Sequence, residues 1–278
     1  MHLGEVTAAL ASCVILSPSA LASASASRSQ SSSPPSDATS HAEADSDALT
    51  SMDRPGLANV TQTAPLHSLV TEQTLQVALP GEQVEVVTPL VLVRFALLSW
   101  LELRTQLPSS VVRFPEDASS EVLVDDWRFG VAAAADLSSN VSASLVPTLA
   151  VPLGSPDAGA AGVDASLQAN LSWSVAPKLE LVFAAQGGWQ HVERGAGRVA
   201  MFRGMGGALV DFRLFPQLMC FVQSYAQYVH STSVEPVLGG GLAWWVTPGL
   251  QLHAEASSIL SDDSPPASLS VGAGVQWW

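Results

Sequence analysis

The chain has few charged residues, no long apolar run and only two cysteines, and each shortage excludes a class of protein. Charged residues make up 13% of the 278 residues, whereas hydrophobic residues make up 47%, a balance that is unusual for a soluble protein. A helix that spans a membrane needs about 18 or more consecutive apolar residues, and no such run follows the N-terminal segment. Because only helices and closed β-barrels pair every backbone group within a bilayer, the sequence predicts a barrel.

The shortage of cysteine and of basic residues narrows the functional classes further. Cys13 falls in the expected export signal, so Cys220 would be alone in the mature chain and could not form an internal disulfide. Acidic residues outnumber basic ones by 25 to 11, which disfavours a nucleic-acid partner because phosphate binding needs positive charge. The acidic excess either aids solubility during export or favours neutral and cationic solutes in a barrel.

The first quarter of the chain contains two segments that are not expected to join the fold. Residues 1–26 are apolar, rich in alanine and serine, and end in the small-x-small pattern that signal peptidase reads, although they lack the usual basic residues at the start. Residues 27–66 are rich in serine and proline and show no hydrophobic period, which predicts a disordered periplasmic tail. The sequence therefore predicts a cleaved signal peptide, a tail, and an outer-membrane barrel over residues 67–278.

From His67 onward, apolar and polar side chains alternate, as they do in strands with two different faces. Over 164–175 every second residue is apolar, and 179–189, 250–256 and 268–277 repeat the pattern. Membrane strands run about ten residues, and the sequence divides into about twelve such segments. The fold class predicted is all-β, a transmembrane antiparallel up-and-down β-barrel of about 12 strands preceded by a disordered N-terminal segment.

The links between these segments alternate in length, which is typical of barrels with short periplasmic turns and long outer loops. The short links are expected at 96–99, 138–140, 176–178, 215–217 and 247–249, and the long ones at 109–122, 154–162, 190–198, 229–233 and 260–266. This arrangement puts both ends of the barrel segment in the periplasm. The eight tryptophans lie mostly near the predicted strand ends, which favours two aromatic girdles at the membrane interfaces.

Several stretches also resemble one known family. They are Thr88–Arg94, Trp100–Arg104, Leu145–Gly154, Val237–Leu252, Ser261–Pro266 and Val271–Gly274. Over about residues 68–278 the chain is similar to the outer-membrane transporters grouped as "MetA-pathway of phenol degradation" proteins. The resemblance implies a barrel that passes small hydrophobic or aromatic solutes. It also implies a basic residue before the terminal aromatic, where this chain has Gln276 and two tryptophans.

No catalytic, nucleotide-binding or metal-binding motif is present, and we expect neither an enzyme nor a cofactor nor a metal site. His253, Glu255 and Ser257 share one face of a predicted strand and suggest an outer-membrane hydrolase at first sight. Side chains two apart on a strand lie ~7 Å apart, however, which is too far for a base to bond its orienting group. We expect them to be polar residues of the lumen.

Charged side chains that project away from the apolar faces are the candidate functional residues. If they pair across the lumen they form a structural ion network, and if they do not they line an aqueous path and set its selectivity. The predicted lumen-lining residues are Glu102, Arg104, Asp126, Arg128, Glu180, Arg203, Asp211, Arg213, His253 and Glu255.

The first functional hypothesis is a passive channel or transporter for small solutes, including hydrophobic or aromatic ones. The alternative is a non-conducting structural or surface-interaction barrel that acts through its outer loops. Either would have outer-membrane lipid and the barrel-assembly machinery as partners, and the channel would add a small-molecule solute.

Overall fold

The computed structural model describes residues 61–79, 83–115, 119–155, 162–194, 197–229, 234–260 and 266–277. Over these residues the chain forms fourteen strands. The described residues contain no helix that is long and apolar enough to cross a membrane. The strands are β1 (Leu69–Leu79), β2 (Val84–Leu98), β3 (Leu101–Gln106), β4 (Ser110–Phe114), β5 (Glu121–Val124), β6 (Trp127–Ser138), β7 (Val141–Val151), β8 (Asp164–Ala176), β9 (Leu179–Arg194), β10 (Gly197–Phe215), β11 (Leu218–Val229), β12 (Val234–Thr247), β13 (Leu250–Ile259) and β14 (Ala267–Trp277).

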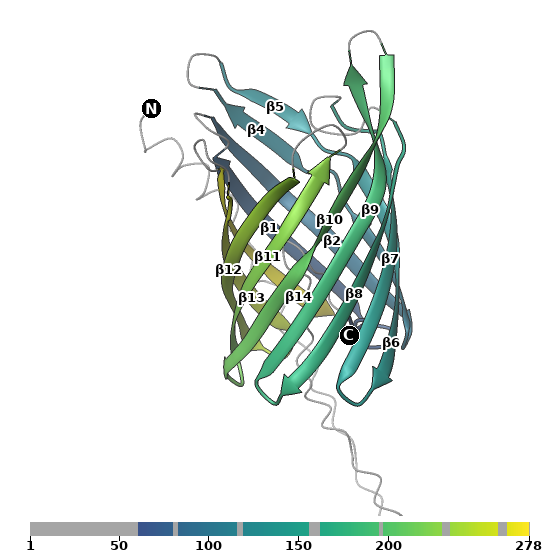
Figure 1. Cartoon of the computed structure of the whole chain (residues 1–278), viewed down its shortest axis with the longest axis vertical. Coiled ribbons are helices and arrows are strands. Elements are labelled where there is room, and N and C mark those ends of the chain that lie inside the picture. The colour runs from purple at the N-terminus through teal and green to yellow at the C-terminus, as the bar shows by residue number, and fades with distance from the viewer. Residues whose placement is uncertain are drawn as a thin grey trace, which may run out of the picture. The chain divides into compact units, whose positions relative to one another are not determined.

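Twelve of the described strands close into an antiparallel barrel (Figure 1). The order around it is β1-β14-β13-β12-β11-β10-β9-β8-β7-β6-β3-β2, and β2 pairs back with β1. Leu69 at the start of β1 therefore lies opposite both Trp277 of β14 and Phe95 of β2. Closure pairs the backbone of every one of these strands on both sides, as hydrocarbon surroundings require. The predicted fold class and strand number are confirmed.

Two of the expected long links are wrong, because strands continue into them. Within 109–122, β4 pairs with Val84–Thr88 of β2 and β5 pairs with β4, so a hairpin extends the sheet outside the closed barrel. Within 190–198, β9 and β10 stay paired as far as Arg194 and Gly197. The valines of β4 and β5 favour extended backbone. In both links the backbone pairing continues although polar and apolar residues no longer alternate clearly.

The barrel is apolar outside and polar inside. On β8, Leu167 is 51% exposed while its neighbour Gln168 is 8% exposed, and Leu171 and Asn170 repeat the contrast. A soluble sheet would bury the leucines instead, since monomeric soluble proteins rarely expose large continuous apolar surfaces. The outer surface is therefore the one that faces lipid, and the buried polar face lines the lumen.

The five short turns lie at one end of the barrel, which we call the short-turn end. The opposite end, with the longer links, is the long-link end. Both Leu69 and Trp277 lie at the short-turn end, since they pair beside the turn that follows β2. Most of the described tryptophans are exposed there or near the other rim, but Trp245 points inward with 3% exposure and packs on Met219 and Ala243.

Candidate functional site

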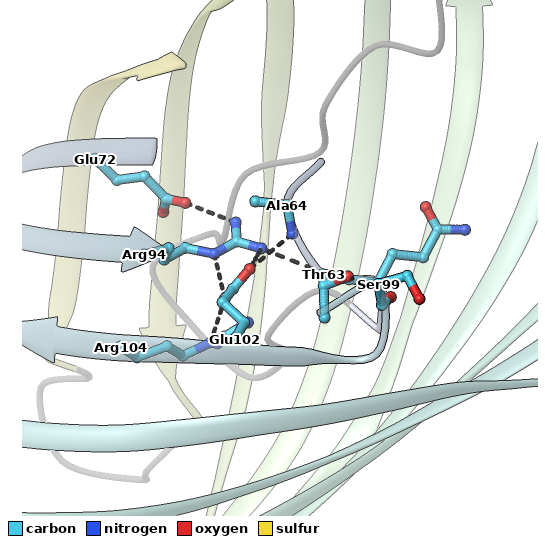
Figure 2. A network of polar contacts seen from close by, with 8 residues as sticks. Thr63, Ala64, Glu72, Arg94, Ser99, Glu102 and Arg104 are labelled. Carbon is cyan, nitrogen blue, oxygen red and sulfur yellow. Dashed lines mark hydrogen bonds and ion pairs between the residues drawn. The ribbon is translucent and has the colours of Figure 1, made fainter. Parts of the chain in front are cut away.

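Four charged side chains meet inside the short-turn end of the barrel (Figure 2). Arg94 of β2 is completely buried, and its Nη1 donates to Glu72 Oε1 at 2.9 Å. Its Nε and Nη2 donate to the Glu102 carboxylate at 2.8 and 3.1 Å. Arg104 Nε donates to the same Glu102 Oε1 at 2.8 Å. We call these four residues the ion cluster; it contains two arginines and two glutamates and is electrically balanced.

The ion cluster depends on Glu102. Arg94 and Arg104 are direct cross-strand partners on β2 and β3, a placement that is unfavourable for two like charges. Glu102 Oε1 accepts a hydrogen bond from each of them and so bridges the two guanidinium groups. Charge-assisted bonds of this kind are stronger than neutral ones. Because the cluster is buried, removing one partner would leave an uncompensated charge inside the barrel and destabilise the fold.

The segment Thr61–Ser68, which we call the inner segment, enters the barrel beside the ion cluster. Ala64 N donates to Glu102 Oε2 at 2.7 Å, and Thr63 Oγ1 donates to the Ser99 carbonyl at 2.8 Å. Thr61 shares a hydroxyl hydrogen bond of 2.8 Å with Ser142 of β7. Ala64 and Ser68 are buried. The inner segment therefore occupies part of the lumen at the short-turn end.

A turn returns the inner segment to the barrel wall. Ser68 N donates to the Pro65 carbonyl at 2.9 Å, and His67 N donates to the Ala96 carbonyl at 3.1 Å. His67 has a φ of 62°, in the left-handed region that allows such a sharp reversal. Residues 61–66 were expected to be part of a disordered tail, yet they make these contacts. Residues 1–60, with the expected signal peptide and most of that tail, lie outside the described residues.

A second polar group lies in the lumen beside β11, β13, β14 and β1. Gln223 Nε2 donates to Glu255 Oε1, and Thr74 and His253 Nε2 share a hydrogen bond of 3.4 Å. The hydroxyl of Ser257 bonds that of Ser268 at 2.7 Å. These contacts tie the strands of the wall together.

The remaining lumen holds a cavity of about 480 Å³ on the β3 and β6–β11 side. It lies toward the long-link end, because its lining includes Gln106 near the end of β3, Asp164 at the start of β8 and Gln227 near the end of β11. Arg104, Arg128 and Arg203 all reach it. The ion cluster and the cavity thus share Arg104.

The structure brings together only some of the ten predicted lumen residues. Arg104, Arg128 and Arg203 line the cavity, Glu102 joins Arg104 in the ion cluster, and Glu255 and His253 lie in the second polar group. Three others lie apart: Glu180 accepts a hydrogen bond from Ser172, Asp126 accepts one from Gly154 N at 3.0 Å, and Arg213 is exposed. Asp211 is buried at 3% exposure.

Sequence reasoning missed Glu72 and Arg94, the two partners that complete the ion cluster. Both lie on the inward face of their strands, which Glu72 shares with Val70 and Thr74, and Arg94 with Ala96. The valine-rich stretch around Arg94 hides this parity because it is apolar on both faces. Both would have been found if every charged residue within a predicted strand had been assigned to the lumen.

Comparisons with known proteins support the fold and not a particular activity. Neither a known protein family nor a curated protein sequence matches the chain. Solved structures are similar. The COG4313 outer membrane channel from Pseudomonas putida F1 has a TM-score of 0.61 at 13% identity, covering 78% of this chain and 98% of its own. The NanC porin has a TM-score of 0.51 at 11% identity, covering 74% and 98%.

At such low identity these likenesses establish a transmembrane β-barrel fold. Membership of the phenol-degradation transporter family is not established by them, and that resemblance stays a prediction. A likeness of fold does not identify the solute, because the solute is selected by the side chains that line the lumen.

Proposed function

We propose that the protein is a passive channel of the bacterial outer membrane for small solutes. The observation that carries the proposal is the 480 Å³ cavity enclosed by a closed barrel with an apolar outer surface. A volume of ~300–1,000 Å³ suits a small-molecule site. The fold similarity to a solved outer-membrane channel supports the same function.

The proposal includes a route to the membrane and an orientation within it. The chain would be exported with its signal peptide removed, and the assembly machinery would insert the barrel with the short-turn end in the periplasm, as the lengths of the links favour. Extracellular protease should then reach the β4–β5 hairpin in whole cells while it spares the inner segment. Cleavage of the inner segment in intact cells would reverse this orientation.

The family resemblance favours small hydrophobic or aromatic solutes. Apolar side chains in the cavity lining, among them Leu92, Val146 and Met205, support entry of such molecules. Proteoliposomes containing the refolded protein should take up labelled phenol faster than empty liposomes do, and equally sized neutral sugars provide the comparison. A rate for phenol equal to that of empty liposomes would remove this solute class.

A second candidate is a non-conducting barrel that acts through its surface, and the β4–β5 hairpin favours it. This hairpin stands outside the closed barrel, and Val122 at its outer strand is 65% exposed. Single-channel recording of the refolded protein in planar bilayers separates the two functions. Conductance steps support the channel, whereas their absence at every voltage would leave the surface function.

A further inference from the structure

We infer that the lumenal cavity binds small carboxylates that also carry hydroxyl groups, and that Arg203 is the residue that selects them. The inference rests on the proposed channel function, because it names the class of solute that the cavity holds. It departs from the neutral or cationic solutes that the chain's net charge of −14 suggests, and from the apolar solutes that the family resemblance favours, so the phenol and glucuronate measurements decide between the two solute classes.

A row of paired residues runs around the cavity wall from one arginine to another. Arg104 pairs across strands with Gly130, Gly130 with Thr148, and Thr148 with Ser166. Ser166 then pairs with Gly188, and Gly188 with Arg203. All six residues line the cavity. The row spans five inter-strand steps of ~4.8 Å each. Arg104 lies at one end of it and Arg203 at the other.

Small side chains between the two arginines leave the wall hollow. A Cβ on Gly188 would lie 2.7 Å from Ser166 Cβ and 2.5 Å from the Ala165 carbonyl oxygen, and one on Gly130 would lie 3.2 Å from Thr148 Oγ1. Any larger residue at these positions would press on its neighbours. Glycine is therefore required at these two positions, and the row between Arg104 and Arg203 carries no side chain larger than threonine.

The charges that face the cavity are mostly positive. Three arginines line it and Asp164 is the one acidic residue among its described lining residues. Glu102 and Asp125, which bond Arg104 and Arg128 at 2.8 and 3.1 Å, are outside the lining. Asp164 is held by His191, whose N and Nδ1 lie 2.7 and 3.2 Å from its Oδ1. The acidic excess of the chain thus lies elsewhere.

Arg203 is the arginine most available to a ligand. It is exposed to the lumen and forms no ion pair with any residue in the described part of the chain, unlike Arg104 and Arg128. A guanidinium group presents two parallel donors that match the two oxygens of a carboxylate. The site therefore favours a carboxylate over a neutral group of the same size.

Neutral polar groups around the arginines suit hydroxyl groups on the same ligand. Thr148 and Ser166 supply hydroxyls within the row. Gln106 Nε2 is buried without a hydrogen-bond partner among the described residues, and an acceptor in the cavity would satisfy it. Gln190 adds a further amide to the lining, whereas the amides of Gln168, Gln186 and Gln227 already donate to Asn170, Ser166 and Glu235. An apolar anion would leave Gln106 Nε2 without a partner.

The test measures binding separately from conductance. Calorimetry on the folded full-length protein in detergent uses D-glucuronate as the hydroxylated carboxylate, with D-glucose and D-glucosamine as neutral and cationic probes. Glucuronate should bind saturably and more tightly than either. Arg203→Gln should weaken glucuronate binding about tenfold or more, as expected for loss of a charge-assisted bond, and Arg203→Lys should restore part of it. Arg213→Gln, on the same strand but outside the cavity, is the control.

Planar-bilayer recording under a KCl gradient supplies the second measurement. Wild-type protein and Arg213→Gln should prefer chloride over potassium, and Arg203→Gln should lower that preference. Glucuronate binding no tighter than that of glucose, or equal in wild type and Arg203→Gln, would overturn the carboxylate site while conductance steps would still support the channel. Specific glucuronate binding without any conductance would instead remove the channel and leave a lumenal carboxylate site.

Discussion

Glu102→Gln should destabilise the barrel far more than its isosteric size suggests. The substitution keeps the shape of the side chain and removes one negative charge at a position that is completely buried. Arg94 and Arg104, which are direct cross-strand partners, would then share Glu72 as the remaining carboxylate of the ion cluster. Breaking a buried ion pair by removing one partner costs about 3–5 kcal/mol, and we expect a loss of stability of that size.

The matched control is Glu85→Gln, which removes a charge from a different ion pair. Glu85 accepts from Arg113 Nε at 2.7 Å, but its side chain is 25% exposed and that of Arg113 is 30% exposed. Water screens such a pair, so we expect a loss of about 1 kcal/mol or less. Reversible urea unfolding of both variants in detergent micelles, followed by band shift on unboiled gels, measures the difference. Equal stability losses in the two variants would refute the assignment of Glu102 as the centre of the cluster.

Three further predictions concern the lumen and the outer surface. Deleting residues 61–66, which removes most of the inner segment's contacts at the short-turn end, should raise single-channel conductance; an unchanged conductance would mean that the segment does not narrow the path. Gly188→Ala should destabilise the fold by about 1–3 kcal/mol through overpacking against Ser166, measured by the same urea unfolding, whereas Ala185→Gly on the lipid face of β9 should not change the cavity. Trp244 is 50% exposed and Trp245 is 3% exposed, so Trp244→Phe should lower the fraction of fluorescence quenched by brominated lipid and Trp245→Phe should raise it. The opposite pair of changes would reverse the assignment of the two faces of β12.

Most of the barrel could be predicted from the sequence, because its outer surface imposes a pattern that the chain cannot avoid. Lipid selects apolar residues at every second position, and the intervening residues are all polar over 164–175 of β8 and 250–257 of β13. An even number of strands then follows from fully antiparallel closure, and short turns at one end with longer links at the other are usual for bacterial barrels. The hairpin β4–β5 was missed because it lies beyond the lipid, where no such pattern is imposed.

The candidate site was harder to predict, because contacts in the lumen depend on register and on which strands meet. Parity alone places Arg104 and Arg203 inward, but only the pairing of five successive strand neighbours puts them at the two ends of one row. Arg213 has the same parity as Arg203 and lies outside the cavity, because it is near the opposite end of β10. The contacts of the inner segment have no periodic signal at all, since it forms no strand.

Arg104 connects the two parts of the lumen, and this connection gives a last prediction. Its Nε bonds Glu102, which also accepts from Ala64 N of the inner segment, while its side chain reaches the cavity. Glu102→Gln would remove the negative charge that offsets Arg104, so the cavity would become more positive and glucuronate should bind several-fold more tightly than in wild type. By linkage, glucuronate should stabilise Glu102→Gln against urea more than it stabilises wild type. Glu85→Gln should leave the affinity unchanged because Glu85 lies on the β2 extension that pairs with β4. Equal affinity in wild type and Glu102→Gln would show that the ion cluster and the cavity act independently, whatever the stability of the variant.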